Sequence, residues 1–195
     1  MSDLVKGTTA RLVFPRGIQY LTLDVAPSSA GGLYTARFQG PEPRVATDDT
    51  TVSVVPRGAR HPFDLVARRA HFTLSPDVEW HIVFQGPAVH VEADLTGLRL
   101  RSLQTAAGMA DAHFLLPETD RTVPIRLGDG ARKITFRRPP GVGVSLLGAH
   151  GVTGLSLDGR WMGSQPAIDW RSIEETARGR YEITLDSGAN RLTIA

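Results

Sequence analysis

The stretch Gly130-Ala-Arg-Lys-Ile-Thr-Phe136 decides how this sequence folds, because its pattern recurs along the chain. A glycine or another small residue comes first, a few variable positions follow, and an apolar–hydroxyl–apolar triplet ends the unit. The clearest further copies are Gly17-Ile-Gln-Tyr-Leu-Thr-Leu23 and Gly188-Ala-Asn-Arg-Leu-Thr-Ile194. Because side chains alternate between the two faces of a β-strand, each triplet would bury its apolar residues and expose its hydroxyl.

Weaker copies give the unit a regular spacing. Their central residues are Thr73, Glu92, His113 and Ser156, and together with Thr135 these centres lie 19, 21, 22 and 21 residues apart. A fixed period of this size indicates stacked units, since one unit cannot bury its apolar face alone. We predict an all-β fold, a β-solenoid or roll of stacked rungs of about 21 residues each. A β-sandwich, which also has short alternating strands, is the alternative.

Length and spacing also predict the domain organisation. A chain of 195 residues suits a single β domain spanning residues 1–195. The step from Ser156 to Thr193 is 37 residues, which leaves room for an inserted loop at residues 158–180. Within that insertion, Ile168 to Ala177 could form a short amphipathic helical turn.

The composition excludes several classes of site. The chain has no cysteine, so disulfides, thiolate metal ligands and a cysteine nucleophile are absent. A formal net charge of only +2 gives no reason to expect a specific nucleic-acid partner. The first residues lack the apolar stretch of a secretion signal, and no apolar run approaches the ~18 residues that span a bilayer. We therefore expect a cytoplasmic protein, although the absence of cysteine is equally compatible with an envelope protein. We also expect no cofactor.

The second half of the chain resembles a known family. The runs Trp80-His-Ile-Val-Phe-Gln-Gly86 and Ala93-Asp-Leu-Thr-Gly-Leu-Arg-Leu100, followed by the recurrent Gly-Ala-x-x-apolar-Thr-apolar phrase, carry the resemblance. With these features the chain resembles the bacterial toastrack-type, putative-adhesin β-solenoid domains, which include stand-alone actinobacterial proteins of unknown role. The resemblance covers residues 78–195 well and residues 1–75 more weakly. It implies a stacked-strand fold and protein or surface interaction, and it supplies no active-site residues.

One cluster of polar residues could hold a metal ion. His90, Glu92 and Asp94 alternate along one stretch and would point to the same face of a strand. If the next repeat stacks in register, His113 comes close to Glu92. Two imidazoles and one carboxylate form a facial site for zinc or iron that leaves positions open for substrate. The candidate metal ligands are therefore His90, Glu92 and His113, although a polar outer face on a half-buried strand has the same pattern.

Two further groups are candidates for contact with a partner. Trp161 and Trp170 lie in the predicted insertion, and tryptophan often anchors interfaces. Equally, the two side chains could clamp the insertion onto the body of the protein. Five cations lie within 13 residues, and if the rungs stack, some of them could form a stripe for an acidic partner, anionic lipid or nucleic acid, or a solvated face. These cations are Arg126, Arg132, Lys133, Arg137 and Arg138.

Catalysis has no local support in the sequence, which lacks a Gly-x-Ser-x-Gly elbow and a phosphate-binding loop. We name no catalytic residue, and the leading hypothesis is a non-enzymatic interaction module acting as scaffold or sensor in a bacterial protein complex. One alternative is an enzyme, small-ligand or metal-binding protein that uses His90, Glu92 and His113. The other is a binder of anionic polymers or membrane surfaces. Because the sequence ends inside a repeat, the last strand edge near Ala195 either pairs internally or supports self-association, and we favour a homo-oligomer.

Overall fold

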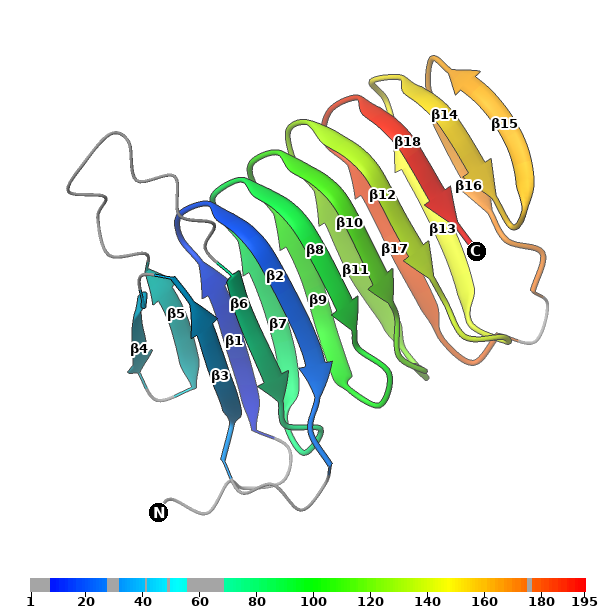
Figure 1. Cartoon of the computed structure of the whole chain (residues 1–195). Coiled ribbons are helices and arrows are strands. Elements are labelled where there is room, and N and C mark those ends of the chain that lie inside the picture. The colour runs from blue at the N-terminus through cyan, green and yellow to red at the C-terminus, as the bar shows by residue number, and fades with distance from the viewer. Residues whose placement is uncertain (1–7, 28–31, 41, 49, 56–68, 175–176) are drawn as a thin grey trace, which may run out of the picture.

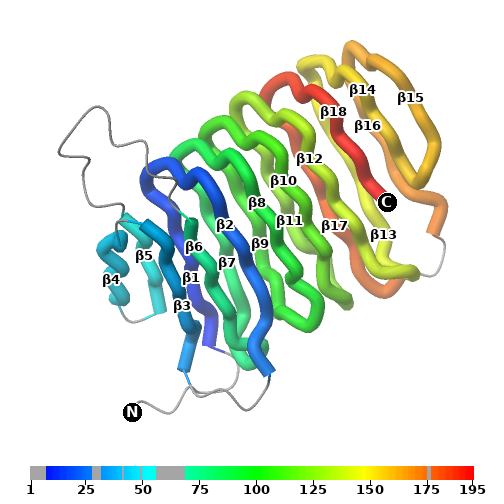
Figure 2. Tube along the Cα trace, in the orientation of Figure 1, coloured from blue at the N-terminus to red at the C-terminus, as the bar shows by residue number. Residues whose placement is uncertain are grey.

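The computed structural model is a roll in which short strands alternate between two sheets (Figure 1, Figure 2). It describes residues 8–27, 32–40, 42–48, 50–55, 69–174 and 177–195, in which all regular secondary structure is β. Sheet A consists, in spatial order, of β16 (Ile168–Arg171), β13 (Gly143–Gly148), β17 (Arg180–Leu185), β11 (Thr122–Leu127), β9 (Arg99–Thr105), β7 (Glu79–Phe84), β1 (Thr9–Phe14), β5 (Thr51–Val55) and β4 (Arg44–Asp48). Sheet B consists of β15 (Arg160–Gln165), β14 (Val152–Leu157), β18 (Ala189–Ile194), β12 (Ala131–Arg137), β10 (Met109–Leu115), β8 (Ala88–Asp94), β2 (Ile18–Val25), β6 (Arg69–Leu74) and β3 (Tyr34–Gln39).

Each rung of the roll combines two strands that are consecutive in the chain, one from each sheet. The rungs stack by parallel pairing in the spatial order β13–β14, β17–β18, β11–β12, β9–β10, β7–β8, β1–β2 and β5–β6. The predicted β-solenoid is therefore confirmed. The sandwich alternative is wrong, because sandwich sheets are built from antiparallel strands.

The sequence repeat sets the register between rungs. His113 pairs with Glu92 on one side and with Thr135 on the other. Thr193 likewise pairs with both Thr135 and Ser156. The central residues of the repeat thus form one column across the sheet, as their period of about 21 residues predicts.

One weak copy of the repeat is shifted in register. Thr22 pairs with Glu92 on one side and with His71 on the other. The centre of that copy is therefore His71 and not Thr73. Both residues face outward on the same strand, two positions apart, so the alternating pattern alone could not separate them.

The rungs do not stack in chain order at either end. The last strand, β18, lies between β12 and β14, and β2 of the first rung lies between β8 and β6 (Figure 1). The outermost strands are β3, β4, β15 and β16, which pair antiparallel with their neighbours. Of the two alternatives for the C-terminal edge, internal pairing is the one observed, because β18 pairs with β12 and β14.

The segment predicted as an inserted loop, residues 158–180, contains β15 and β16. Ile168 and Trp170, which could have begun a helical turn, instead belong to β16 and pack against the core, and residues 175–176 of that segment lie outside the described residues. The segment forms strands because β13 and β14 would otherwise leave a row of unpaired backbone N–H and C=O groups at the end of the stack. Among the described residues, no helix has the length and apolar character needed to cross a membrane.

The core fills the space between the two sheets. Phe114 stacks on Phe136 with ring centroids 5.2 Å apart, and Phe14 stacks on Phe84 at 5.0 Å. In each pair the two residues are in register on adjacent strands, so the repeat itself aligns them. Burial of each side chain contributes about 2–3 kcal/mol.

Glycines allow the rungs to approach closely at the corners. A Cβ atom at Gly128 would lie 2.5 Å from the carbonyl oxygen of Thr105 in the neighbouring rung. No side chain fits at that distance, so only glycine is compatible with this corner.

Candidate interaction surface

The outer surface of sheet B, which we name face B, presents columns of side chains that run across the rungs. On β12 these columns contain Lys133, Thr135 and Arg137, while Ile134 and Phe136 point into the core. Because neighbouring strands are in register, each column continues through the equivalent residues of β10, β8 and β18.

One of these columns consists of residues in the left-handed backbone conformation. The φ angle is 52° at Asp111 and at Lys133, 57° at Arg191 and 69° at Gly154. These four residues, which we name the left-handed column, occupy equivalent positions on four adjacent strands. The conformation interrupts the alternation of the strand, so that Arg132 and Lys133 both point to solvent. It costs a non-glycine residue about 1–2 kcal/mol.

Four cations form a basic band on β12 and β18. Three of them, Arg132, Lys133 and Arg137, were predicted interaction residues, and Arg191 was not. All four are exposed, and within the described part of the chain their side chains have no hydrogen-bond or ion-pair partner. The basic band is therefore free to contact another molecule.

The other two predicted cations lie elsewhere. Arg126 is on β11 in sheet A, where its Nε donates to Asp186 Oδ2 at 2.6 Å. Arg138 follows β12, and its side chain, only 9% exposed, donates to Asp158 at 2.8 Å and to Glu174 at 2.6 Å. Because this guanidinium is buried and pairs with two carboxylates, Arg138 links the end of β12 to the residues that follow β14 and β16. Of the five cations, Arg132, Lys133 and Arg137 therefore share a surface, and Arg126 and Arg138 lie outside it.

The two tryptophans also differ. Trp161 lies at the end of face B, on β15, and is 68% exposed. A Cβ at Gly154 would lie 3.3 Å from Trp161 Cη2 and 3.4 Å from Arg191 Cγ, so the indole and the arginine stem meet above this glycine. Trp170 instead packs against the core from β16 in sheet A. Trp170 is therefore a clamp, and Trp161 is the tryptophan available to a partner.

The three predicted metal ligands do not converge. Glu92 and His113 are adjacent on β8 and β10, as expected. His90 lies in a different column, where its Nδ1 is 3.0 Å from Asp111 Oδ2 and its ring stacks on Tyr20 at 4.8 Å. No three His, Asp or Glu side chains of the described residues have the arrangement of a metal site.

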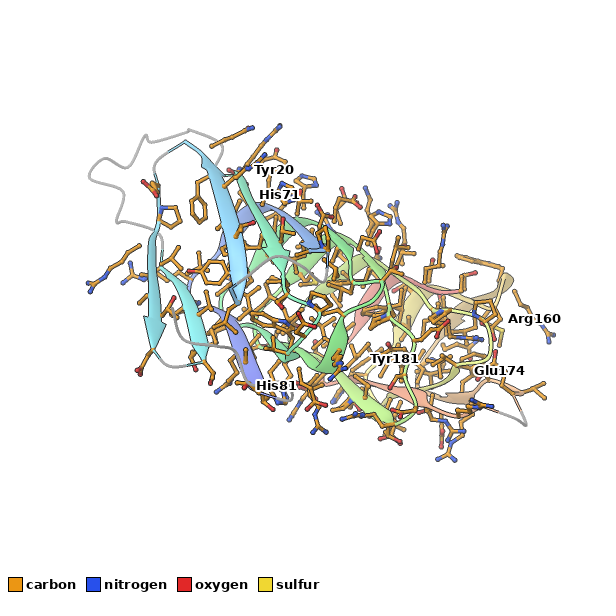
Figure 3. All side chains as sticks on the ribbon, turned by 90° about the horizontal axis from the view of Figure 1, so that it is seen from below. Tyr20, His71, His81, Arg160, Glu174 and Tyr181 are labelled. Carbon is orange, nitrogen blue, oxygen red and sulfur yellow. The ribbon has the colours of Figure 1, made fainter. Side chains whose placement is uncertain are left out.

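An acidic band lies beside the basic band on β10, β8 and β2. Histidines accompany part of it, because His71 Nε2 is 2.6 Å from Asp24 and both His90 and His113 approach Asp111, at 3.0 Å and 3.9 Å. Figure 3 shows His71, with Tyr20, on the opposite side of the roll from His81 of sheet A. The band consists of Asp24, Glu92, Asp94 and Asp111. Face B thus carries both signs of charge in separate bands.

On sheet A, one carboxylate is shared between two arginines. Glu79 accepts from Arg101 at 2.5 Å and from Arg121 at 2.9 Å. Burial opposes ionisation of Glu79, but the two guanidinium groups outweigh it and hold the pKa of that carboxyl below its usual value. Burial, reinforced by the charges of Arg11 and Arg101, lowers the pKa of His81.

Sequence reasoning missed two residues of this surface, Arg191 and Asp111. Both occupy variable positions of the repeat, directly before the apolar–polar–apolar triplet. The signal was present, since superposing the repeat copies places Arg191 beside Lys133 and Asp111. Treating these positions as variable concealed that they share one column.

The sequence matches no family model and no curated protein. Its fold matches the crystal structure of a putative cell adhesion protein from Clostridium sporogenes, with a TM-score of 0.69. The match covers 97% of this chain and 93% of that protein at 14% sequence identity. At this identity the likeness shows the shared fold, a β-roll of stacked rungs.

Proposed function

We propose that this protein is a non-enzymatic interaction module that binds a protein partner through face B, as scaffold or sensor in a complex. Parallel pairing on both sides holds most strands of sheet B in place. A partner would therefore meet a preformed surface, which reduces the entropy lost on binding.

The left-handed column is the observation that carries this proposal. Gly154 shows that the column accommodates glycine, yet Lys133 and Arg191 occupy it at a cost of about 1–2 kcal/mol each. Neither charge has an ion-pair partner among the described residues. Residues that adopt a strained backbone conformation without making a contact that stabilises the fold are typical of functional positions.

The shape of face B also favours a large partner. It is hollowed around His113 and Thr135, by about 350 Å³, and around Tyr20 and His71, by about 530 Å³. Both hollows are open to solvent, whereas small-molecule sites enclose most of the ligand surface. The solved structure with the same fold is described as a putative cell adhesion protein, which is consistent with an interaction role.

The double variant Lys133→Gly/Arg191→Gly tests the proposal, because it removes two charges of face B and should not impair folding. Tagged wild-type protein captures partners from the native host extract at moderate salt, and mass spectrometry identifies a stoichiometric partner. We expect the double variant and Trp161→Ala to lose that partner at least about tenfold. The matched control Arg99→Ser/Arg171→Ser removes two exposed cations of sheet A and should keep it.

Two results would contradict the proposal. One is a partner that the double variant retains, and the other is a partner that the sheet A control loses to the same extent. About one equivalent of metal in the same preparation would favour the metal-binding alternative instead.

A further inference from the structure

We propose that the protein partner of face B is a second copy of this chain, and that the two copies form a symmetric dimer face to face. This inference rests on the proposed function, because it assigns the occupant of the same surface. The sequence-based reason for a homo-oligomer, an open edge at the C-terminus, does not hold. Face B supplies a different reason, which lies in the order of its strands and charges.

The strand order of sheet B suits a two-fold arrangement. The sheet has nine strands, and β10 is the middle one. A two-fold axis that runs parallel to the strands and passes over β10 places β12 of one copy against β8 of the other. The same axis places β18 against β2, β14 against β6 and β15 against β3. The two sheets then cover each other over their whole length.

The charges on face B are complementary under this symmetry. Leu115 pairs with Arg137 on β12 and with Asp94 on β8, so the axis over Leu115 brings Arg137 against Asp94 of the second copy. Glu92 of the second copy comes against Thr135, between Lys133 and Arg137. Arg137 therefore meets Asp94 twice, once on each side of the axis, and Lys133 comes against His90 of the second copy. Charge complementarity of this kind fixes the register of an interface.

Two further exposed residues of face B, Leu115 and Trp161, also meet a partner under this symmetry. Leu115, which is 38% exposed, lies at the axis and would meet Leu115 of the second copy. Leu115 is the last residue of β10, and Asp111 and His113 lie along the same axis, so the apolar contact sits at one end of a polar centre. At the two ends, Trp161 and Arg37 belong to the same column of face B, through Ser156 and His71. Trp161 would therefore lie against Arg37 of the second copy, a favourable cation–π pair.

The area of face B is sufficient for a stable dimer. Nine strands about 4.8 Å apart give a length of roughly 40 Å, and strands of six to seven residues give a width of roughly 20 Å. The product is about 800 Å² per copy, which equals the area that each partner of a standard-size interface buries.

Reversing the charge of one band at a time tests the dimer. Arg132→Glu/Arg137→Glu reverses two of the four charges of the basic band, and Glu92→Lys/Asp94→Lys reverses two of the four charges of the acidic band. Each variant alone should weaken self-association at least about 100-fold, because like charges face each other. Mixing the two variants in equal amounts should restore a dimer with one copy of each, since opposite bands then meet on both sides of the axis. Restoration by mixing also shows that both variants are folded.

Sedimentation and light scattering measure the result at about 100 µM protein, where a dimer with a Kd of ~1–10 µM is largely formed. The matched control Asp169→Lys/Glu182→Lys reverses two exposed carboxylates of sheet A and should remain dimeric. Raising the salt to ~1 M should dissociate the wild-type dimer, because the Debye length falls to about 3 Å.

The outcomes separate this inference from the proposed function. A wild-type chain that is monomeric at this concentration overturns the dimer, and so does a dimer that neither band reversal weakens. In either case, a different protein captured through Lys133 and Arg191 would still support face B as an interaction surface. Loss of the dimer in each variant and its recovery in the mixture would support the inference.

Discussion

Replacing Lys133 by glycine should stabilise the protein, although glycine within a strand normally destabilises it. At a φ angle of 52°, Lys133 carries a cost of about 1–2 kcal/mol that glycine does not have. Glycine loses more conformational freedom on folding, which offsets about 0.5–1 kcal/mol. The expected net gain in the free energy of unfolding is therefore about 0.5–1 kcal/mol. For a chain of this length, it corresponds to an increase in Tm of about 1–4 °C.

Urea denaturation measures the change, and the adjacent Arg132→Gly is the matched control. Arg132 is exposed on the same strand but is not among the residues with positive φ. Its replacement should therefore lower the free energy of unfolding by about 0.5–1 kcal/mol. If both glycine variants lose the same free energy, Lys133 carries no strain. The physical basis for assigning function to the left-handed column would then be refuted.

Three other substitutions probe the interior and the sheet A face. Gly128→Ala should lower the free energy of unfolding, measured by urea denaturation, by at least about 2 kcal/mol, because its Cβ would lie 2.5 Å from Thr105 O. A loss below about 0.5 kcal/mol would mean that the backbone at this corner shifts to accommodate the methyl group. Tyr181→Phe removes the hydrogen bond that the buried hydroxyl donates to Pro117 O at 2.6 Å, and should cost about 1–2 kcal/mol in thermal unfolding; an unchanged Tm would contradict this role. His81 has a lowered pKa, so the folded state binds its proton less readily than the unfolded state. The stability that neutral His81 contributes is fully present above the unfolded pKa of about 6.5 and is lost as the pH falls through the folded pKa. His81→Gln should therefore flatten the dependence of the free energy of unfolding on pH in this range. An unchanged slope would show that other groups cause the dependence.

The repeat made the core of the fold predictable. The pairing of Glu92 with His113 follows from the period, because equivalent residues of stacked units lie in register. The repeat also contains a signal for the left-handed column. In Ala131 to Ile134 two polar residues separate two inward residues, and strict alternation allows only one. An interruption of this kind indicates a bend or bulge in the strand.

Other features depend on contacts that the sequence pattern does not record. Arg137 and Arg138 are neighbours in the chain, but one belongs to face B and the other is buried between Asp158 and Glu174. Asp158 follows β14, which β18 separates from β12, and Glu174 follows β16, so a local pattern cannot place either partner of Arg138. The spatial order of the rungs was equally hidden. Rungs with similar patterns can exchange places without changing the local sequence signal.

The positions of the first and last rungs affect how the roll can come apart. In a repeat protein whose units stack in chain order, a terminal unit can fray while the rest stays folded. In this protein β17–β18 lies between β11–β12 and β13–β14, and β1–β2 lies between β7–β8 and β5–β6. Detaching either terminal rung would divide the stack and expose core side chains on both sides of the break. The chain ends are thereby tied to the cooperative unfolding unit, and loss of residues 180–195 would split the molecule instead of shortening it.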